Sequence, residues 1–215
     1  MYALFFDLDG TLVDSSKGII NSFIHSFEKM NLDTPDNKTL TTFIGPPLEV
    51  TFANFFSSQE EISKAILHFR NYYESKGVNQ FTKYPDIVNQ LFNLKQKGFK
   101  LFVTTSKEEK MAKKLIQDAG LTKYFTGIYG ALPKSFHKTD VLQRALFLNE
   151  PQKEHSVIIG DTIYDMKAGK NLGILSMAVT WGFGLEFELK EIKPTYLVHT
   201  PQEMTKQLSQ LFLNE

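Results

Sequence analysis

The N-terminal stretch constrains the fold of this chain more than any other part of the sequence. Ala3-Leu4-Phe5-Phe6 is a run of four apolar residues, which is typical of a strand in a sheet covered on both faces. Asp7-Leu8-Asp9-Gly10 follows directly. Because residues i and i+2 of a strand point to the same side, Asp7 and Asp9 can face one pocket; if the strand ends at Leu8, Asp9 lies on the loop instead. Two carboxylates this close require a compensating cation, a shared proton or an exposed turn.

The remaining sequence has a helical part followed by an alternating part. Apolar spacing predicts helices over 15–30, 48–56 and 59–73, and no strand pattern lies between Asp14 and Phe81. After Tyr84, helices are predicted over 86–97, 108–119, 139–148 and 165–171 and from Pro201 onward, and they alternate with strands over 99–104, 124–129, 155–159 and 174–179. Such alternation indicates an α/β fold with a Rossmann-like parallel sheet.

The order of these parts predicts two domains. We expect an α/β core made of residues 1–13 and 83–215, and an all-helical cap domain made of residues 14–82. The cap would be inserted at the carboxyl end of the first strand, above the crevice where open α/β sheets bind ligands. It can therefore act as a lid. Its phenylalanines, Phe43, Phe52, Phe55 and Phe56 among them, are most simply its own core, and the alternative is that some of them line the lid's inner surface.

Composition excludes several classes of function. The formal net charge is zero and neither half carries a basic block, so the electrostatic footprint of a nucleic-acid-binding protein is missing. The chain has no cysteine, which excludes disulfides, thiolate metal sites and cysteine nucleophiles. No apolar run approaches the length that spans a bilayer. We expect a soluble cytoplasmic protein without nucleic-acid or membrane partners.

Three further strand ends carry polar residues that could act with Asp7. Thr104, Thr105 and Ser106 follow the second core strand and are expected to lead into a helix N-terminus, which favours anions, although an ordinary Ser/Thr cap is the simpler reading of this run alone. Lys138 precedes a predicted helix, where it opposes the helix dipole unless an anion lies nearby. Asp161 follows another apolar strand, and Asp165 is four residues on, so one helical turn would bring both to one pocket. Their oxygens suit a hard cation such as magnesium.

The run Asp7-Leu8-Asp9-Gly10-Thr11 resembles the first motif of the haloacid dehalogenase superfamily, most of whose members are magnesium-dependent phosphatases. The resemblance implies a sheet order of 5-4-1-2-3 and a helical cap. It also assigns the second motif to Thr105, with Thr104 as the competing register, and the third motif to Lys138. Lys134 is the weaker candidate for that lysine, and the acidic-Gly turn that often precedes the third motif is missing here. The fourth motif matches Asp161 and Asp165.

The resemblance further implies a mechanism in which Asp7 attacks phosphorus and Asp9 acts as general acid and base. Magnesium would be bound by Asp7, the backbone carbonyl of Asp9 and Asp161, with Asp165 in or near the shell. Thr105, Ser106 and Lys138 would bind the phosphoryl group, together with Gly45 of the Gly-Pro-Pro-Leu loop.

The segments 11–19 and 43–48 look like those of the phosphoglycolate phosphatase-like subgroup. We therefore expect a small phosphorylated metabolite as substrate, with phosphoglycolate first and a nucleoside 5'-monophosphate or pyrophosphate as alternatives. A sugar-phosphate mutase and a non-catalytic phosphate-binding protein are further alternatives. The expected state is a monomer or weak homodimer. The run Trp181-Gly182-Phe183-Gly184 is predicted to be a tight turn with a packed aromatic, and a substrate contact is its second interpretation.

Overall fold

A central parallel sheet organises the structure, a computed structural model that describes residues 2–211. Its middle strand is β1 (Ala3–Phe6), which pairs in parallel with β4 (Lys100–Glu108) and β6 (Ser156–Gly160). Among the described residues, the sheet has six strands in the order β5-β4-β1-β6-β7-β8. The outer strands are β5 (Gly127–Ala131), β7 (Leu175–Val179) and β8 (Tyr196–Val198).

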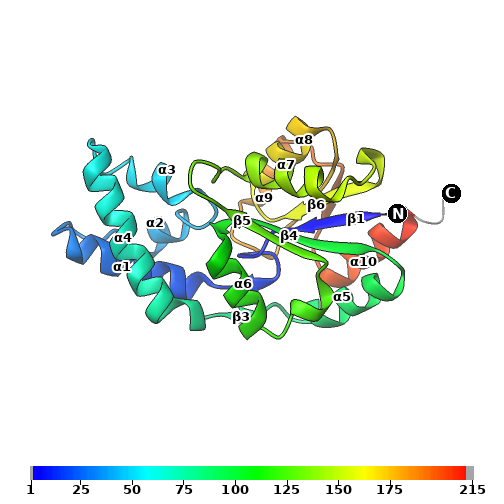
Figure 1. Ribbon diagram of the computed structural model, residues 1–215, viewed down its shortest axis with the longest axis horizontal. Coiled ribbons are helices and arrows are strands. Elements are labelled where there is room, and N and C mark those ends of the chain that lie inside the picture. The colour runs from blue at the N-terminus through cyan, green and yellow to red at the C-terminus, as the bar shows by residue number, and fades with distance from the viewer. Residues whose placement is uncertain (1, 212–215) are drawn as a thin grey trace.

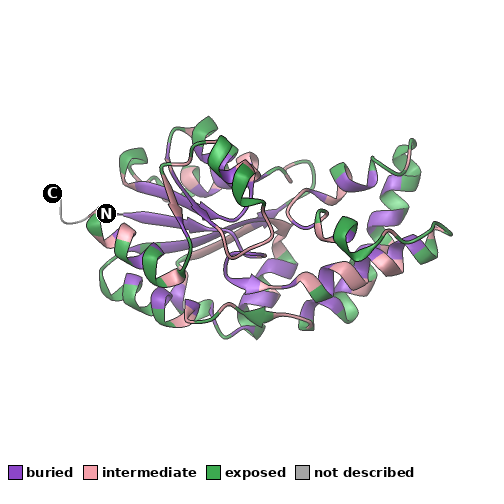
Figure 2. Cartoon of the chain, turned by 180° about the vertical axis from the view of Figure 1, so that it is seen from behind, coloured by how far each residue is buried: buried purple, intermediate pink, exposed green. Residues whose placement is uncertain are grey.

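Helices cover both faces of this sheet (Figure 1). They are α5 (Ile87–Gln96), α6 (Glu109–Asp118), α7 (Lys138–Asn149), α8 (Ile163–Leu172), α9 (Glu186–Glu191) and α10 (Pro201–Gln210). All four residues of β1 are fully buried, and Figure 2 shows the sheet buried throughout its centre. Since side chains alternate along a strand, Leu4 and Phe6 pack with α5, α6 and α10, whereas Ala3 and Phe5 pack with α7 and α8. The run of four apolar residues is thus explained by a strand that is buried on both faces.

Four helices form a separate layer beyond one end of the sheet (Figure 1). They are α1 (Ser16–Lys29), α2 (Asn37–Thr41), α3 (Leu48–Phe52) and α4 (Gln59–Ser75), and we call the stretch that holds them, residues 15–81, the cap. The Phe23 ring is fully buried at its centre and contacts the rings of Phe43, Phe52 and Phe69. Helix α4 begins with a capping box between Ser58 and Glu61, which satisfies backbone donors that the first turn leaves free.

A short antiparallel ribbon joins the cap to the sheet. Strand β2 (Val13–Asp14) enters the cap and β3 (Thr82–Lys83) leaves it, with Val13 opposite Lys83 and Asp14 opposite Thr82. The segment between them is helical, as its sequence pattern indicates. That the cap is an independent domain with boundaries at 14 and 82 stays a prediction.

The predicted fold class is confirmed, and two details differ. Without β8, the order of the remaining strands equals the expected 5-4-1-2-3 when each is numbered along the chain. Strand β8 extends the sheet at its edge, and α2, α9 and β8 are short elements that no sequence period indicated. The three-residue 3₁₀ helices are η1 (Gly77–Asn79), η2 (Thr122–Tyr124) and η3 (Lys153–His155). In the part of the chain that the structure describes, no helix is both long and apolar enough to cross a membrane.

Candidate active site

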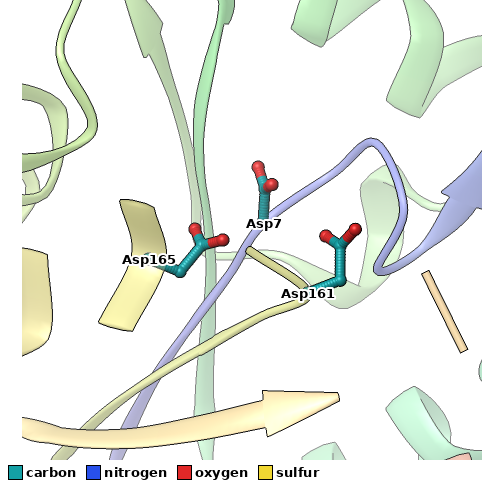
Figure 3. Close-up of side chains that lie close together, drawn as sticks. All are labelled: Asp7, Asp161 and Asp165. Atoms are coloured by element: carbon teal, nitrogen blue, oxygen red, sulfur yellow. The ribbon is translucent and has the colours of Figure 1, made fainter. Parts of the chain in front are cut away.

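Three buried carboxyl groups meet where β1 and β6 end (Figure 3). Asp7 follows β1, Asp161 follows β6, and Asp165 lies in the first turn of α8. Phe6 is level with Ile159 in the parallel pair, and the Asp7 N–H donates to the Ile159 carbonyl over 2.8 Å. Each residue offers one carboxylate oxygen to a group whose members lie within 4.8 Å of one another. The pairing of β1 with β6 therefore brings together residues that are more than 150 positions apart.

Lys138 is the counter-ion of this group. It is the first residue of α7, and its Nζ lies 2.6 Å from Asp7 Oδ1 and 2.8 Å from Asp165 Oδ1. The ammonium also donates to the Thr104 carbonyl over 3.1 Å. These contacts explain why a lysine occupies a helix N-terminus, where the dipole alone disfavours it. The alternative candidate, Lys134, is exposed and has a left-handed backbone with φ +66°.

The electrostatics of the group fit a divalent cation. Burial raises the pKa of Asp7 to about 7, against the opposing attraction of Lys138, and raises the pKa of Asp161 to about 8. The carboxylates around Lys138 outweigh its burial and raise its pKa as well, so it stays charged. If a cation displaced the protons of all three carboxyl groups, the carboxylates and the Lys138 ammonium together would carry two net negative charges in a buried site. Oxygen ligands with that excess charge suit magnesium, for which Asp7, Asp161 and Asp165 are the candidate side-chain ligands.

Two loops hold the Asp161 carboxylate in place. Its Oδ1 accepts from Thr11 Oγ1 over 3.0 Å, and its Oδ2 accepts from the Phe183 backbone N–H over 2.8 Å. A Cβ on Gly10, which has φ +86°, would lie 2.1 Å from Asp161 Oδ2. A Cβ on Gly182 would lie 2.4 Å from the same atom. The aromatic-Gly run after β7 thus contacts the Asp161 carboxylate, a role that neither the predicted turn nor the alternative substrate contact included.

The Asp9 side chain points to different partners. It accepts a hydrogen bond from Ser15 Oγ, and its Oδ2 lies 3.0 Å from Lys107 Nζ. Lys107 Nζ lies 4.1 Å from the centre of the Tyr73 ring, which belongs to α4 of the cap. Among the described residues, the candidate metal group contains the side chains of Asp7, Asp161 and Asp165, and not that of Asp9. The predicted metal contact of Asp9 is its backbone carbonyl, so its carboxyl group stays available for proton transfer.

The strand predicted over 99–104 is longer than expected, whereas the helix predicted over 108–119 is found within one residue of each end. Strand β4 continues to Glu108 through an irregular register opposite β5, and α6 begins only at Glu109. Thr105 is buried, and its Oγ1 accepts from the Lys107 N–H over 3.2 Å. The anion-binding role predicted for this segment would therefore depend on its hydroxyls, since Thr105 lies four residues before α6.

One pocket connects these groups with the cap. Asp7, Asp9, Thr105 and Ser106 line it from the sheet side, and Gly45 lines it from the cap side with φ +110°. Thr104 is fully buried outside this lining, and its Oγ1 has no hydrogen-bond partner among the described residues. The geometry thus favours Thr105 over Thr104 as the hydroxyl beside Asp7. Of the four cap phenylalanines in the sequence analysis, Phe43 lines the pocket and Phe52 is fully buried in the cap core.

Comparison with known proteins identifies the family of this chain. The family model described as haloacid dehalogenase-like hydrolase matches residues 4–179. This chain belongs to the haloacid dehalogenase-like hydrolases. A haloacid dehalogenase-like hydrolase of solved structure from Streptococcus pneumoniae has 40% identity and a TM-score of 0.90, over 96% of this chain and 98% of that one. A predicted phosphatase from Clostridium acetobutylicum has 33% identity and a TM-score of 0.94, over 98% and 99% of the two chains.

Curated members of the haloacid dehalogenase-like hydrolases that resemble this chain carry different names. The tyrosine-protein kinase PtkA of Mycobacterium tuberculosis is 32% identical over 90% of this chain and 67% of its own length. A 5'-nucleotidase of Pseudomonas aeruginosa is 31% identical over 90% and 89% of the two chains. A phosphoglycolate phosphatase of Aquifex aeolicus is 32% identical over 96% of each. The relatives therefore share a fold and differ in the molecule after which they are named.

Proposed function

We propose that this hydrolase is a magnesium-dependent phosphatase that cleaves small phosphomonoesters through an aspartyl-phosphate on Asp7. The observation that carries the proposal is the position of Asp7, which lines the pocket while it contacts Lys138 and lies beside Asp161 and Asp165. Asp7, Asp161, Asp165 and the Asp9 carbonyl would hold the magnesium ion. When bound, the ion would offset the negative charge that otherwise keeps a carboxylate away from a phosphate.

The first step uses the two aspartates of the N-terminal motif. An Asp7 oxygen forms a bond to phosphorus as the bond from phosphorus to the leaving oxygen breaks, and the Asp9 carboxyl gives that oxygen a proton. In the second step, a water attacks phosphorus, Asp9 takes the proton of the water, and the bond to Asp7 breaks. Inorganic phosphate leaves and both aspartates return to their first state. Asp9 suits this role because it lines the pocket and its carboxyl lies outside the candidate metal group.

Other residues bind the transferring group. We assign Lys138, Thr105 and Ser106 to the phosphoryl oxygens, where negative charge accumulates during transfer. Gly45 and its loop cover the pocket from the cap side, which favours the exclusion of bulk water. The substrate is a small phosphorylated metabolite, and its leaving group occupies the space between this loop and the sheet. Phosphoglycolate, nucleoside 5'-monophosphates and pyrophosphate differ in the charge and shape that they place there.

Replacement of the nucleophile tests the proposal. With p-nitrophenyl phosphate and Mg²⁺, Asp7→Asn should lose at least about a thousandfold in kcat/KM, since a residual site without its nucleophile retains little catalysis. The matched control is Asp118→Asn, because Asp118 lies at the end of α6 and pairs with Lys114, and it should keep full activity. EDTA should abolish turnover by the unmodified protein. Appreciable metal-dependent turnover by Asp7→Asn would exclude Asp7 as the nucleophile.

The same assay separates the remaining alternatives. A requirement for a catalytic amount of a sugar bisphosphate would indicate a mutase. Inactivity on a broad panel of phosphate esters with Mg²⁺ would indicate a phosphate-binding protein.

A further inference from the structure

The pocket between cap and sheet has room for more than a phosphate group. Its cavity volume is about 130 Å³, and it also opens to solvent. Its sheet side holds Asp7 and Thr105, and its cap side is formed by residues of α1, α3, α4 and the Gly45 loop. Because the leaving group points away from the nucleophile during an in-line attack, it must occupy the cap side. The chemistry of the cap side therefore decides which phosphate esters are accepted.

Aromatic and aliphatic side chains form most of the cap-side wall. Phe69 and Tyr73 lie on one face of α4 with their rings nearly parallel, at an interplanar angle of 5°. Phe43 and Ile44 line the pocket from the neighbouring loop, and Phe136 lines it from the sheet side. A planar ring in this space would lie among several aromatic side chains, with which stacked or edge-on contact is favourable.

The charges of the pocket disfavour a second anionic group. Every lysine and arginine among the described lining residues is already paired. Lys107 lies 3.0 Å from Asp9, and Lys110 lies 2.9 Å from Glu74. Arg70 is shared between Glu49 at 3.7 Å and Glu108 at 3.8 Å. Apart from Asp7 and the Asp9–Lys107 pair beside the phosphate, the charged side chains among the described lining residues are three glutamates and two cations. They are Glu49, Glu74, Glu108, Arg70 and Lys110. A carboxylate or a second phosphate on the leaving group would meet net negative charge.

The pocket does offer uncharged polar contacts. The Tyr73 hydroxyl is buried in the pocket lining beside Lys107. The Ser106 hydroxyl is buried without a hydrogen-bond partner among the described residues, and we assign it to the phosphoryl group. A leaving group that offers an acceptor or donor to Tyr73 would add a polar contact without adding charge. Ring nitrogens, hydroxyls and carbonyls of an uncharged leaving group offer such a contact.

We infer that the preferred substrate is a phosphomonoester whose leaving group is uncharged and carries a planar aromatic ring. This inference rests on the proposed phosphatase function and narrows its substrate class. Phosphoglycolate and pyrophosphate, which bring a second negative charge, are then poor substrates.

Four esters of primary alcohols test the inference, since their leaving oxygens have similar intrinsic reactivity. Benzyl phosphate and adenosine 5'-monophosphate carry an uncharged ring, ethyl phosphate carries no ring, and phosphoglycolate carries a carboxylate. With Mg²⁺, kcat/KM for the two ring-bearing esters should exceed that for the other two by about tenfold or more, the size expected for a few aromatic contacts. A higher kcat/KM for phosphoglycolate, or for pyrophosphate in a parallel assay, would overturn the inference while the phosphatase function stands. Failure to hydrolyse any ester, p-nitrophenyl phosphate included, would overturn both.

Two pairs of variants separate the contributions of shape and charge. Phe43→Leu should lower the benzyl-to-ethyl ratio of kcat/KM about fivefold, because it removes an aromatic ring and keeps an apolar side chain. Phe55→Leu is its control, since that ring contacts Phe43 but does not line the pocket. Glu49→Gln should raise the phosphoglycolate-to-ethyl ratio severalfold, because it frees Arg70 from one carboxylate. Glu60→Gln, at an exposed position of α4, should leave the ratio unchanged. Unchanged ratios in both Phe43→Leu and Glu49→Gln would contradict the inference.

Discussion

Lys138 illustrates how a single buried side chain can balance an active site. Its ammonium contacts Asp7 and Asp165 and has lost almost all of its exposure to solvent. Removing one partner of a buried ion pair leaves the other charges uncompensated. Lys138→Met should therefore lower kcat/KM about a hundredfold or more, since the phosphoryl oxygens also lose a donor.

The matched control for this change lies four residues upstream. Lys134→Met removes the same charge from an exposed position and should keep activity within about twofold, as for most surface substitutions. Steady-state hydrolysis of p-nitrophenyl phosphate measures both. Equal losses in the two variants would contradict this prediction, because they would show that the site depends on Lys134 as much as on Lys138.

The buried aspartates predict a pH-dependent stability of the metal-free protein. Burial raises the pKa of Asp7 and Asp161 from 3.8 to about 7 and about 8, so the folded state binds protons more tightly than the unfolded state. The stabilisation from these protons is complete below about pH 4. It decreases progressively as the pH rises and is lost once the pH has passed 7 to 8. The melting temperature in EDTA should fall over this range, and Mg²⁺ should restore it most strongly at the high end, because the metal binds the deprotonated carboxylates.

Thermal unfolding at a series of pH values, with EDTA and with Mg²⁺, measures this effect. Asp161→Asn should flatten the EDTA profile between pH 6 and 8.5. A metal-free protein whose melting temperature rises with pH over that range would contradict the assignment.

At this scale, the sequence predicted the residues that follow apolar strands. Asp7, Asp161 and Asp165 were predictable because a parallel sheet brings the carboxyl ends of its strands to one edge. The contacts of Lys107 and of the Phe183 N–H were not, since they depend on how the Tyr73 ring and the turn after β7 lie in space. The roles assigned to the site residues stay predictions.

At the scale of elements, the turn after β1 depends on one glycine. Gly10 has φ +86°, and a Cβ there would lie 2.1 Å from Asp161 Oδ2. Gly10→Ala must therefore displace a candidate metal ligand as well as strain the backbone. We expect kcat/KM to fall about tenfold or more with a weakened response to Mg²⁺, as 1 Å displacements in an active site commonly cause.

Gly98 provides a control for the backbone effect. It also has φ +86°, and no atom lies within 4 Å of a Cβ built there. Gly98→Ala should cost about 1 kcal/mol of stability and leave kcat/KM unchanged. Denaturant unfolding and Mg²⁺ titration of activity distinguish the two variants. Full activity in Gly10→Ala would contradict the prediction, because it would mean that the Asp161 carboxylate can move without lowering kcat/KM.

The ends of the elements were harder to predict than the elements themselves. Strand β4 continues through Thr104, Thr105 and Ser106 because β5 lies beside it in the sheet, a long-range pairing that the local pattern does not contain. Helix α9 and strand β8 have only six and three residues, too few to establish a period. The long helices α1 and α4 were predicted to within two residues of each end, since their apolar stripes face each other in the cap.

At the scale of the whole molecule, ion pairs between the cap and the sheet domain cross the mouth of the pocket. Glu74 of α4 lies 2.9 Å from Lys110 of α6, and Arg70 of α4 lies 3.8 Å from Glu108. Exposed pairs contribute little each, but each of these favours contact between the cap and the sheet domain. Glu74→Lys should therefore raise KM about threefold with a smaller change in kcat, as expected when an attraction of up to 1 kcal/mol is replaced by repulsion.

The reciprocal exchange tests this interpretation. Adding Lys110→Glu to Glu74→Lys restores opposite charges at the same positions, and KM should return toward its original value. Lys113→Glu is a control, because Lys113 pairs with Glu109 within α6. A double variant no better than Glu74→Lys would mean that the two charges act separately.

The β2–β3 ribbon has a consequence for the order of events in turnover. Strand β2 begins only three residues after Gly10, and Ser15 at the base of the cap donates to Asp9. Tyr73 of α4 covers Lys107, the other neighbour of Asp9. The carboxyl group to which we assign proton transfer is thus held by side chains of both the cap and the sheet domain. Separation of the two would remove these contacts, so we expect bond cleavage to wait until the ester is enclosed, when stray water is less able to intercept the reaction.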